Sequence, residues 1–169
     1  MSAFGLDSSL DKARRRLHGR PPTGRRPRSD RGRLRIDQRV LSVVEEAAGG
    51  YDRPAMAEMR QRVAEACRRQ ELAPPSRATL YKLLARIPTR TYRLGDLPPA
   101  VRNALYNLEP ESDVPAHQVA FYCFNYGDLR AISFAAGLPW LALYQARRLP
   151  GFRAKSRGLL DAVATARGL

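Results

Sequence analysis

The sequence predicts an all-α protein with two small helical units and a basic, disordered N-terminal arm. From residue 36 onwards apolar side chains recur every three or four positions, which favours helices over strands. Clusters of Pro and Gly cut this pattern into segments of helix length. Before residue 36 the pattern is missing. We therefore expect an arm at 1–35, one helical domain at 36–94 and a second at 95–169.

The charge of the chain restricts its partners. The formal net charge is +14 and the isoelectric point is near 10.9. A positive field of this size favours polyanions, either nucleic acid or an anionic membrane surface. No apolar run reaches the length of a membrane span, and the N-terminus has neither the charged start nor the apolar core of a signal peptide. We expect a cytoplasmic, bacterial, nucleoid-associated protein without membrane contact.

The arm mixes Gly, Pro and Arg around the stretch GRPPTGRRPRSDRGR. Such a composition cannot bury enough apolar surface to offset the entropy of ordering, so we expect disorder in the free protein. Arg25, Arg26 and Arg28 would contact phosphates or enter a minor groove. Within residues 6–17 leucines recur at helical spacing, and either a short helix or a frayed terminus fits them.

Residues 36–94 predict three helices, of which the last two are joined by a short polar turn. The first would end at Gly49-Gly50, the second would start near Pro54, and the third would span Ser76–Ile87 with Ser76 as its cap. This is the layout of a helix-turn-helix unit, whose final helix enters the major groove. The alternating segment 89–94 also permits a short strand or wing. The apolar positions whose spacing predicts the three helices are Ile36, Val40, Val43, Val44, Ala47, Met56, Met59, Val63, Ala66, Cys67, Leu80, Leu83, Leu84 and Ile87.

Two motifs in this unit carry a resemblance: the "Y-x-R-P" step before the second helix and the stretch PPSRATLYKLLARIP (74–88). With the initial helix, they resemble the helix-turn-helix domain that precedes the catalytic core in phage Mu-like and related transposases. The resemblance covers residues 36–88 and implies DNA binding only. One departure is Ala55, which stands where such domains often place a Ser or Thr cap.

The third helix would present a polar, basic face to a duplex. We expect its N-terminal side chains to read base edges and its later ones to lie near phosphates. The alternative is a core-packing helix with a solvated basic face. The face comprises Arg77, Thr79 and Tyr81 as candidate readers, and Lys82 and Arg86 as candidate phosphate contacts.

Residues 95–169 predict further helices at 98–107 with Asp96 as cap, from Asp113 and Pro115 to Tyr126-Gly127, and at 156–166. The stretch LRAISFAAGLPWLALYQARR (129–148) resembles the general bacterial helix-turn-helix pattern. Its second helix would expose Tyr144, Gln145, Arg147 and Arg148 to base edges or phosphates. The alternative is a pair of core or interface helices with Trp140 buried. The small or apolar positions expected to face inward are Ile132, Ser133, Ala136, Leu138, Leu143 and Ala146, with Gly137 at the turn.

The sequence shows no catalytic constellation, and we expect neither an enzyme nor a cofactor. Cys67 and Cys123 are not in a CxxC pair and have no nearby pair of histidines, so we expect neither a disulfide nor a metal site. The predicted function is sequence-specific binding of double-stranded DNA, as a transcription regulator, a mobile-element accessory factor or an antitoxin-type repressor. A homodimer or a protein partner is compatible with this function. Two alternatives stay open: an RNA-binding or ribosome-associated protein, and a protein–protein adaptor using the apolar region 119–144.

Overall fold

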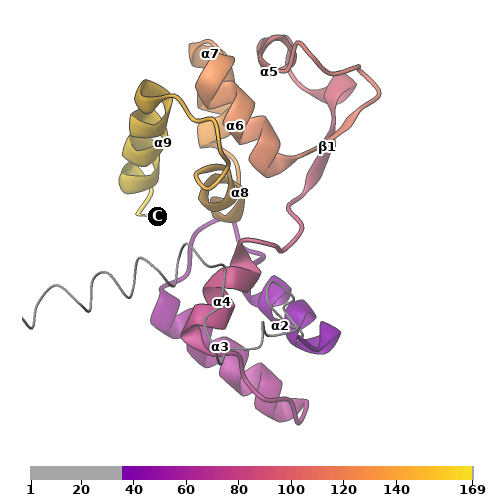
Figure 1. Cartoon of the computed structure of the whole chain (residues 1–169), viewed down its shortest axis with the longest axis vertical. Coiled ribbons are helices and arrows are strands. Elements are labelled where there is room, and N and C mark those ends of the chain that lie inside the picture. Colours follow the sequence, from indigo (N-terminus) through magenta and orange to yellow (C-terminus); the bar gives the residue numbers. More distant parts are fainter. Residues whose placement is uncertain (1–35, 169) are drawn as a thin grey trace, which may run out of the picture. The chain divides into compact units, whose positions relative to one another are not determined.

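The computed structural model describes residues 36–168, and Figure 1 traces them from indigo to yellow. The arm predicted for 1–35, with Arg25, Arg26 and Arg28, lies outside the described residues. The predicted predominance of helix is confirmed: residues 36–168 contain eight α-helices, one short 3-10 helix and two strands of three residues. Residues 36–169 form one compact unit, which includes both predicted domains, 36–94 and 95–169.

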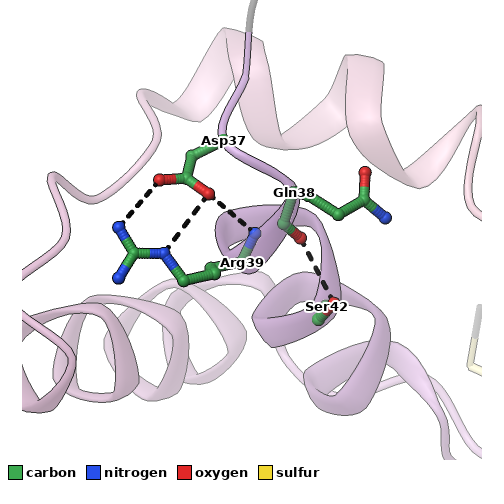
Figure 2. Close-up of polar contacts among 4 residues, drawn as sticks. All are labelled: Asp37, Gln38, Arg39 and Ser42. Atoms are coloured by element: carbon green, nitrogen blue, oxygen red, sulfur yellow. Dashed lines mark hydrogen bonds and ion pairs between the residues drawn. The ribbon is translucent and has the colours of Figure 1, made fainter.

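Three helices make up the first part of this unit: α2 (Gln38–Ala48), α3 (Met56–Arg69) and α4 (Arg77–Leu84). Asp37 caps α2, because its Oδ1 accepts from the backbone N–H of Arg39 at 2.9 Å (Figure 2). The Arg39 side chain folds back onto the same carboxylate, with Nη2 at 3.0 Å from Oδ2. Ser42 Oγ donates to the Gln38 carbonyl at 3.2 Å one turn later. The start of α2 is therefore fixed by local polar contacts.

The turn between α3 and α4 explains where both helices end and begin. Glu71 has φ +56°, and the following N–H, of Leu72, donates to the Cys67 carbonyl at 2.8 Å. Glu71 thus ends α3 in the left-handed conformation that glycine usually adopts at the C-terminal end of a helix. Ser76 then caps α4 as predicted, since its Oγ accepts from the Thr79 N–H at 3.2 Å. Ala55, at the start of α3, makes no side-chain cap.

The strand anticipated in 89–94 is present as β1 (Thr91–Arg93), but its partner was not foreseen. It pairs antiparallel with β2 (Asp113–Pro115), with Tyr92 opposite Val114. Asp113 therefore belongs to a strand and does not open a helix. Between the strands lie the 3-10 helix η1 (Leu94–Asp96) and α5 (Pro99–Ala104). The N-cap of α5 is Pro98, so the expected Asp96 cap is wrong.

The rest of the chain packs around α6 (Ala116–Tyr126), which contacts α5, α7 (Leu129–Ala136), α8 (Trp140–Ala146) and α9 (Ala154–Ala166). Trp140 connects this core to the first three helices. It is buried, and its Nε1–H donates to the Ala48 carbonyl at 3.1 Å. The buried side chains of the core around α6 include Leu105, Val101, Val114, Val119, Phe124, Leu143 and Leu160.

Candidate nucleic-acid interface

The α4 face is accessible; it comprises Arg77, Thr79, Tyr81 and Lys82 of α4 together with Arg86, which follows the end of the helix at Leu84. Arg77, Lys82 and Arg86 are exposed, and Thr79 and Tyr81 are half-buried. Within residues 36–168 none of the three cations forms an ion pair, and α4 contains no acidic residue. The face is therefore cationic and available to an anionic surface.

Packing on the opposite side orients this face. Leu80, Leu83, Leu84 and Ile87 are all buried, as predicted, and α4 packs against α2. The α4 face must then point away from the bundle. The Arg77 guanidinium lies 5.9 Å from the centre of the Tyr81 ring, which places a cation at the N-terminal end of the helix. The Thr79 hydroxyl lies 2.9 Å from Ser76 Oγ, so it already takes part in the cap.

Gln145 does not lie on an exposed face, so its predicted exposure is wrong. Its side chain is 6% exposed, and its Nε2 group donates to the carbonyls of Leu84 and Ile87 at 2.8 Å each. Leu84 is the last residue of α4, where a helix leaves its carbonyls without internal partners, and Ile87 lies in the turn that follows. Gln145 is thus a brace that holds the end of α4 against α8.

The rest of α8 is also internal. Of its seven residues only Tyr144 is not buried. In α7 the residues that face inward are Ala131 and Ala135, whereas Ser133, expected at the crossing of the two helices, is exposed. The inward face of α7 was therefore predicted in the wrong rotational phase, whereas Leu138, Leu143 and Ala146 are buried as predicted. The alternative of two core helices with a buried Trp140 describes this segment.

Arg147 and Arg148 follow α8 and are exposed, but they differ in their surroundings. Arg147 Nε lies 2.7 Å from Asp161 Oδ1 on α9. The Arg148 guanidinium lies 3.9 Å above the Tyr144 ring and makes no ion pair with any residue in 36–168. Of these two arginines, Arg148 is the one whose charge is not neutralised.

A cavity of about 190 Å³ opens beside these arginines, which we name the Arg53 pocket. Its polar lining is Arg53, Tyr144, Arg147 and Arg148, and Trp140 belongs to its apolar lining. The Tyr144 hydroxyl is buried and lacks a hydrogen-bond partner among the described residues. Burial raises the pKa of this phenol, against the opposing effect of the Arg148 charge, so it stays protonated at neutral pH.

Sequence reasoning overlooked two features that bear on function. Arg53 is half-buried between α2 and α3. Its only predicted role is as part of the Y-x-R-P motif, although its charge and its place just before a helix could have marked it as a candidate binding residue. Exposed tyrosines were not foreseen either, yet Tyr106 is 76% and Tyr126 is 43% exposed, with ring centres 6.5 Å apart. No pattern in the sequence distinguishes these tyrosines from buried ones.

In the described residues no group of three or more His, Cys, Asp or Glu side chains could hold a metal ion. Cys67 and Cys123 are free and buried, and burial raises the pKa of the Cys123 thiol to about 12. His117 Nδ1 lies 2.8 Å from Thr89 Oγ1, and burial lowers its pKa. None of the helices in 36–168 is both long and apolar enough to cross a membrane.

Comparisons of this chain with protein-family models, with curated proteins and with solved structures found no match.

Proposed function

We propose that this protein binds double-stranded DNA sequence-specifically, with α4 lying in the major groove. The observation that carries the proposal is the cationic face of a capped helix whose opposite side is buried and whose end is braced by Gln145. A reading helix needs this combination, because side chains discriminate bases only when the helix that presents them is held in one orientation.

The roles of the side chains follow from their positions. Arg77 and Tyr81 stand near the N-terminal end of α4, the end that meets base edges in helix-turn-helix docking. Lys82 and Arg86 lie further along and would contact phosphates. Arg25, Arg26 and Arg28, together with the high net charge, would supply much of the salt-dependent affinity. Gln145 is absent from this set, and Arg147 is largely neutralised by Asp161.

DNA binding is the activity that a transcription regulator, a mobile-element accessory factor and an antitoxin-type repressor have in common. The proposal is made at this level. The resemblance of residues 36–88 to the DNA-binding domain of phage Mu-like transposases supports it, as does the agreement between the predicted and observed cap and buried positions of α4.

The experiment selects preferred duplexes from a random library and measures affinity by fluorescence anisotropy. Arg77→Ala should cost about 1–3 kcal/mol on the preferred site and relax the preference at one base pair. Lys82→Ala should weaken all duplexes about equally. Arg102→Ala, an exposed arginine on α5, is the matched control and should change neither quantity. Failure to enrich any duplex sequence would contradict the proposal.

A second candidate is RNA or single-stranded nucleic acid, favoured by the exposed tyrosines. The Arg153 guanidinium lies 4.7 Å from the centre of the Tyr126 ring, next to Tyr106. Bases stack on such aromatic side chains when cations lie beside them. Under this candidate, single-stranded RNA should bind more tightly than duplex DNA, and Tyr106→Ala should weaken it while Arg77→Ala should not.

A further inference from the structure

Several hydrogen-bond donors of the Arg53 pocket have no partner among the described residues. Arg53 and Arg148 make no ion pair within residues 36–168, and the buried Tyr144 hydroxyl has no partner there. A buried hydroxyl that forms no hydrogen bond destabilises the folded state, because it has lost its hydrogen bonds to water without replacing them. The arrangement fits an external acceptor that takes these donors together.

We propose that Arg53, Tyr144 and Arg148 form a binding pocket for one phosphate group of the DNA backbone. This assignment rests on the proposed function, because the ligand is a phosphodiester of the same duplex that α4 would read. Two guanidinium groups and a phenol are typical donors to phosphate oxygens. Arg147 also lines the pocket, but its charge is already neutralised by the ion pair with Asp161.

The geometry leaves these donors able to bind a ligand. The Arg148 guanidinium, stacked 3.9 Å above the Tyr144 ring, retains N–H groups at its edge that can still donate. The Trp140 ring centre lies 5.8 Å from that of Tyr144 and belongs to the wall of the cavity. An apolar wall lowers the local dielectric constant, so each charge-assisted hydrogen bond there is stronger than in water.

The pocket also stands close to α4. Gln145, which follows Tyr144 on α8, donates to the carbonyls of Leu84, at the end of α4, and of Ile87, in the turn that follows. The Tyr81 side chain is near enough to Tyr144 to raise the pKa of its phenol. A duplex whose groove receives the α4 face would therefore bring a backbone phosphate into the neighbourhood of the Arg53 pocket.

The test compares full-length variants for duplex binding over a range of salt concentrations. Arg53→Ala and Arg148→Ala should each reduce the slope of log affinity against log salt by about 1, for every duplex sequence alike. Arg130→Ala, an exposed arginine that does not line the pocket, is the control and should keep the wild-type slope. Wild-type slopes in both pocket variants, with duplex binding intact, would overturn the inference and leave the proposed function standing.

Tyr144→Phe separates a ligand contact from a structural role. It removes only the unpartnered hydroxyl, so the melting temperature of the free protein should stay level or rise, while duplex affinity should fall by about tenfold. Unchanged affinity would count against the pocket.

Inorganic phosphate supplies the last measurement, at constant ionic strength against chloride. Phosphate should raise the melting temperature of the wild type by more than that of Arg148→Ala, since the non-specific stabilisation by phosphate is common to both. If phosphate shows this difference while no duplex binds, the pocket stands and the proposed function fails. If phosphate shows it and the salt slopes do not change, the assignment to DNA phosphate is wrong.

Discussion

The indole N–H of Trp140 donates to the carbonyl oxygen of Ala48 at 3.1 Å, joining the start of α8 to the end of α2. Because this side chain is also fully buried, Trp140→Ala should destabilise the protein by about 3–5 kcal/mol. Trp140→Phe keeps most of the packing and loses the donor, and about 1–3 kcal/mol is expected from the unpaired carbonyl. Urea unfolding followed by circular dichroism measures both, since the variants lack the chain's single Trp as a fluorophore. A Trp140→Phe variant as stable as the wild type would contradict a role for the hydrogen bond.

Gln145 should matter for stability through the acceptors that it satisfies. Gln145→Ala leaves the carbonyls of Leu84 and Ile87 without this donor and should cost about 1–3 kcal/mol in the free energy of unfolding. The matched control is Gln118→Ala on α6, an exposed glutamine, for which a change within about 0.5 kcal/mol is expected. Chemical denaturation of both variants checks the difference. A loss at Gln145 no larger than that at Gln118 would show that the brace contributes nothing.

Two glycines should respond in opposite directions to Ala. At Gly127, which caps α6, an added Cβ would lie 2.5 Å from the Cys123 carbonyl oxygen and 2.6 Å from Ala131 Cβ. We expect Gly127→Ala to destabilise the protein by about 1–3 kcal/mol, because the end of α6 and the start of α7 must move apart to make room for the added Cβ. At Gly158, inside α9, no atom lies within 4 Å, and Gly158→Ala should stabilise by about 0.5–1 kcal/mol. Thermal unfolding of both variants tests whether the space around the added Cβ decides the sign of the change in stability.

His117 should make the protein sensitive to mild acid. Burial lowers the pKa of its imidazole below the ordinary 6.5, so the unfolded chain takes up a proton at higher pH than the folded one. The stabilising contribution is complete above pH 6.5 and is lost as the pH falls towards the lowered folded-state pKa. His117→Asn should flatten the dependence of the unfolding free energy on pH in that window. The hydrogen bonds from Arg39 hold the pKa of Asp37 below 3.8, so Asp37 titrates outside this window. An unchanged pH dependence of the unfolding free energy in His117→Asn would contradict the assignment to His117.

Local features of the fold could be predicted from the sequence, because they depend on neighbouring residues. Ser76 caps α4, Pro74 and Pro75 precede it, and the apolar positions of α4 are all buried. A cap needs an acceptor within three residues, and an amphipathic helix needs only its own periodicity. The same reasoning placed α2, α3 and α9 within a few residues of their observed bounds.

Features that depend on distant partners could not be predicted. A helical repeat in residues 129–148 shows that some side chains share a face, but it does not show which face the rest of the molecule covers. Gln145 is polar and was therefore assigned to the surface, whereas the carbonyls that accept from it lie 58 and 61 residues away. The pairing of β1 with β2 escaped prediction for the same reason, since the strands are separated by η1 and α5.

The contacts of Trp140 and Gln145 also set an order of events during synthesis. Ala48, Leu84 and Ile87 leave the ribosome long before the α8 residues that bind their carbonyl oxygens, because the sequence separations are 92, 61 and 58 residues. Contacts of such long range form late and slow the folding of a small protein. Until α8 arrives, the C-terminal end of α4 has neither of the two hydrogen bonds that Gln145 supplies. A nascent chain that ends before residue 140 would therefore carry α4 without its brace, and full-length synthesis is what completes the geometry of this helix.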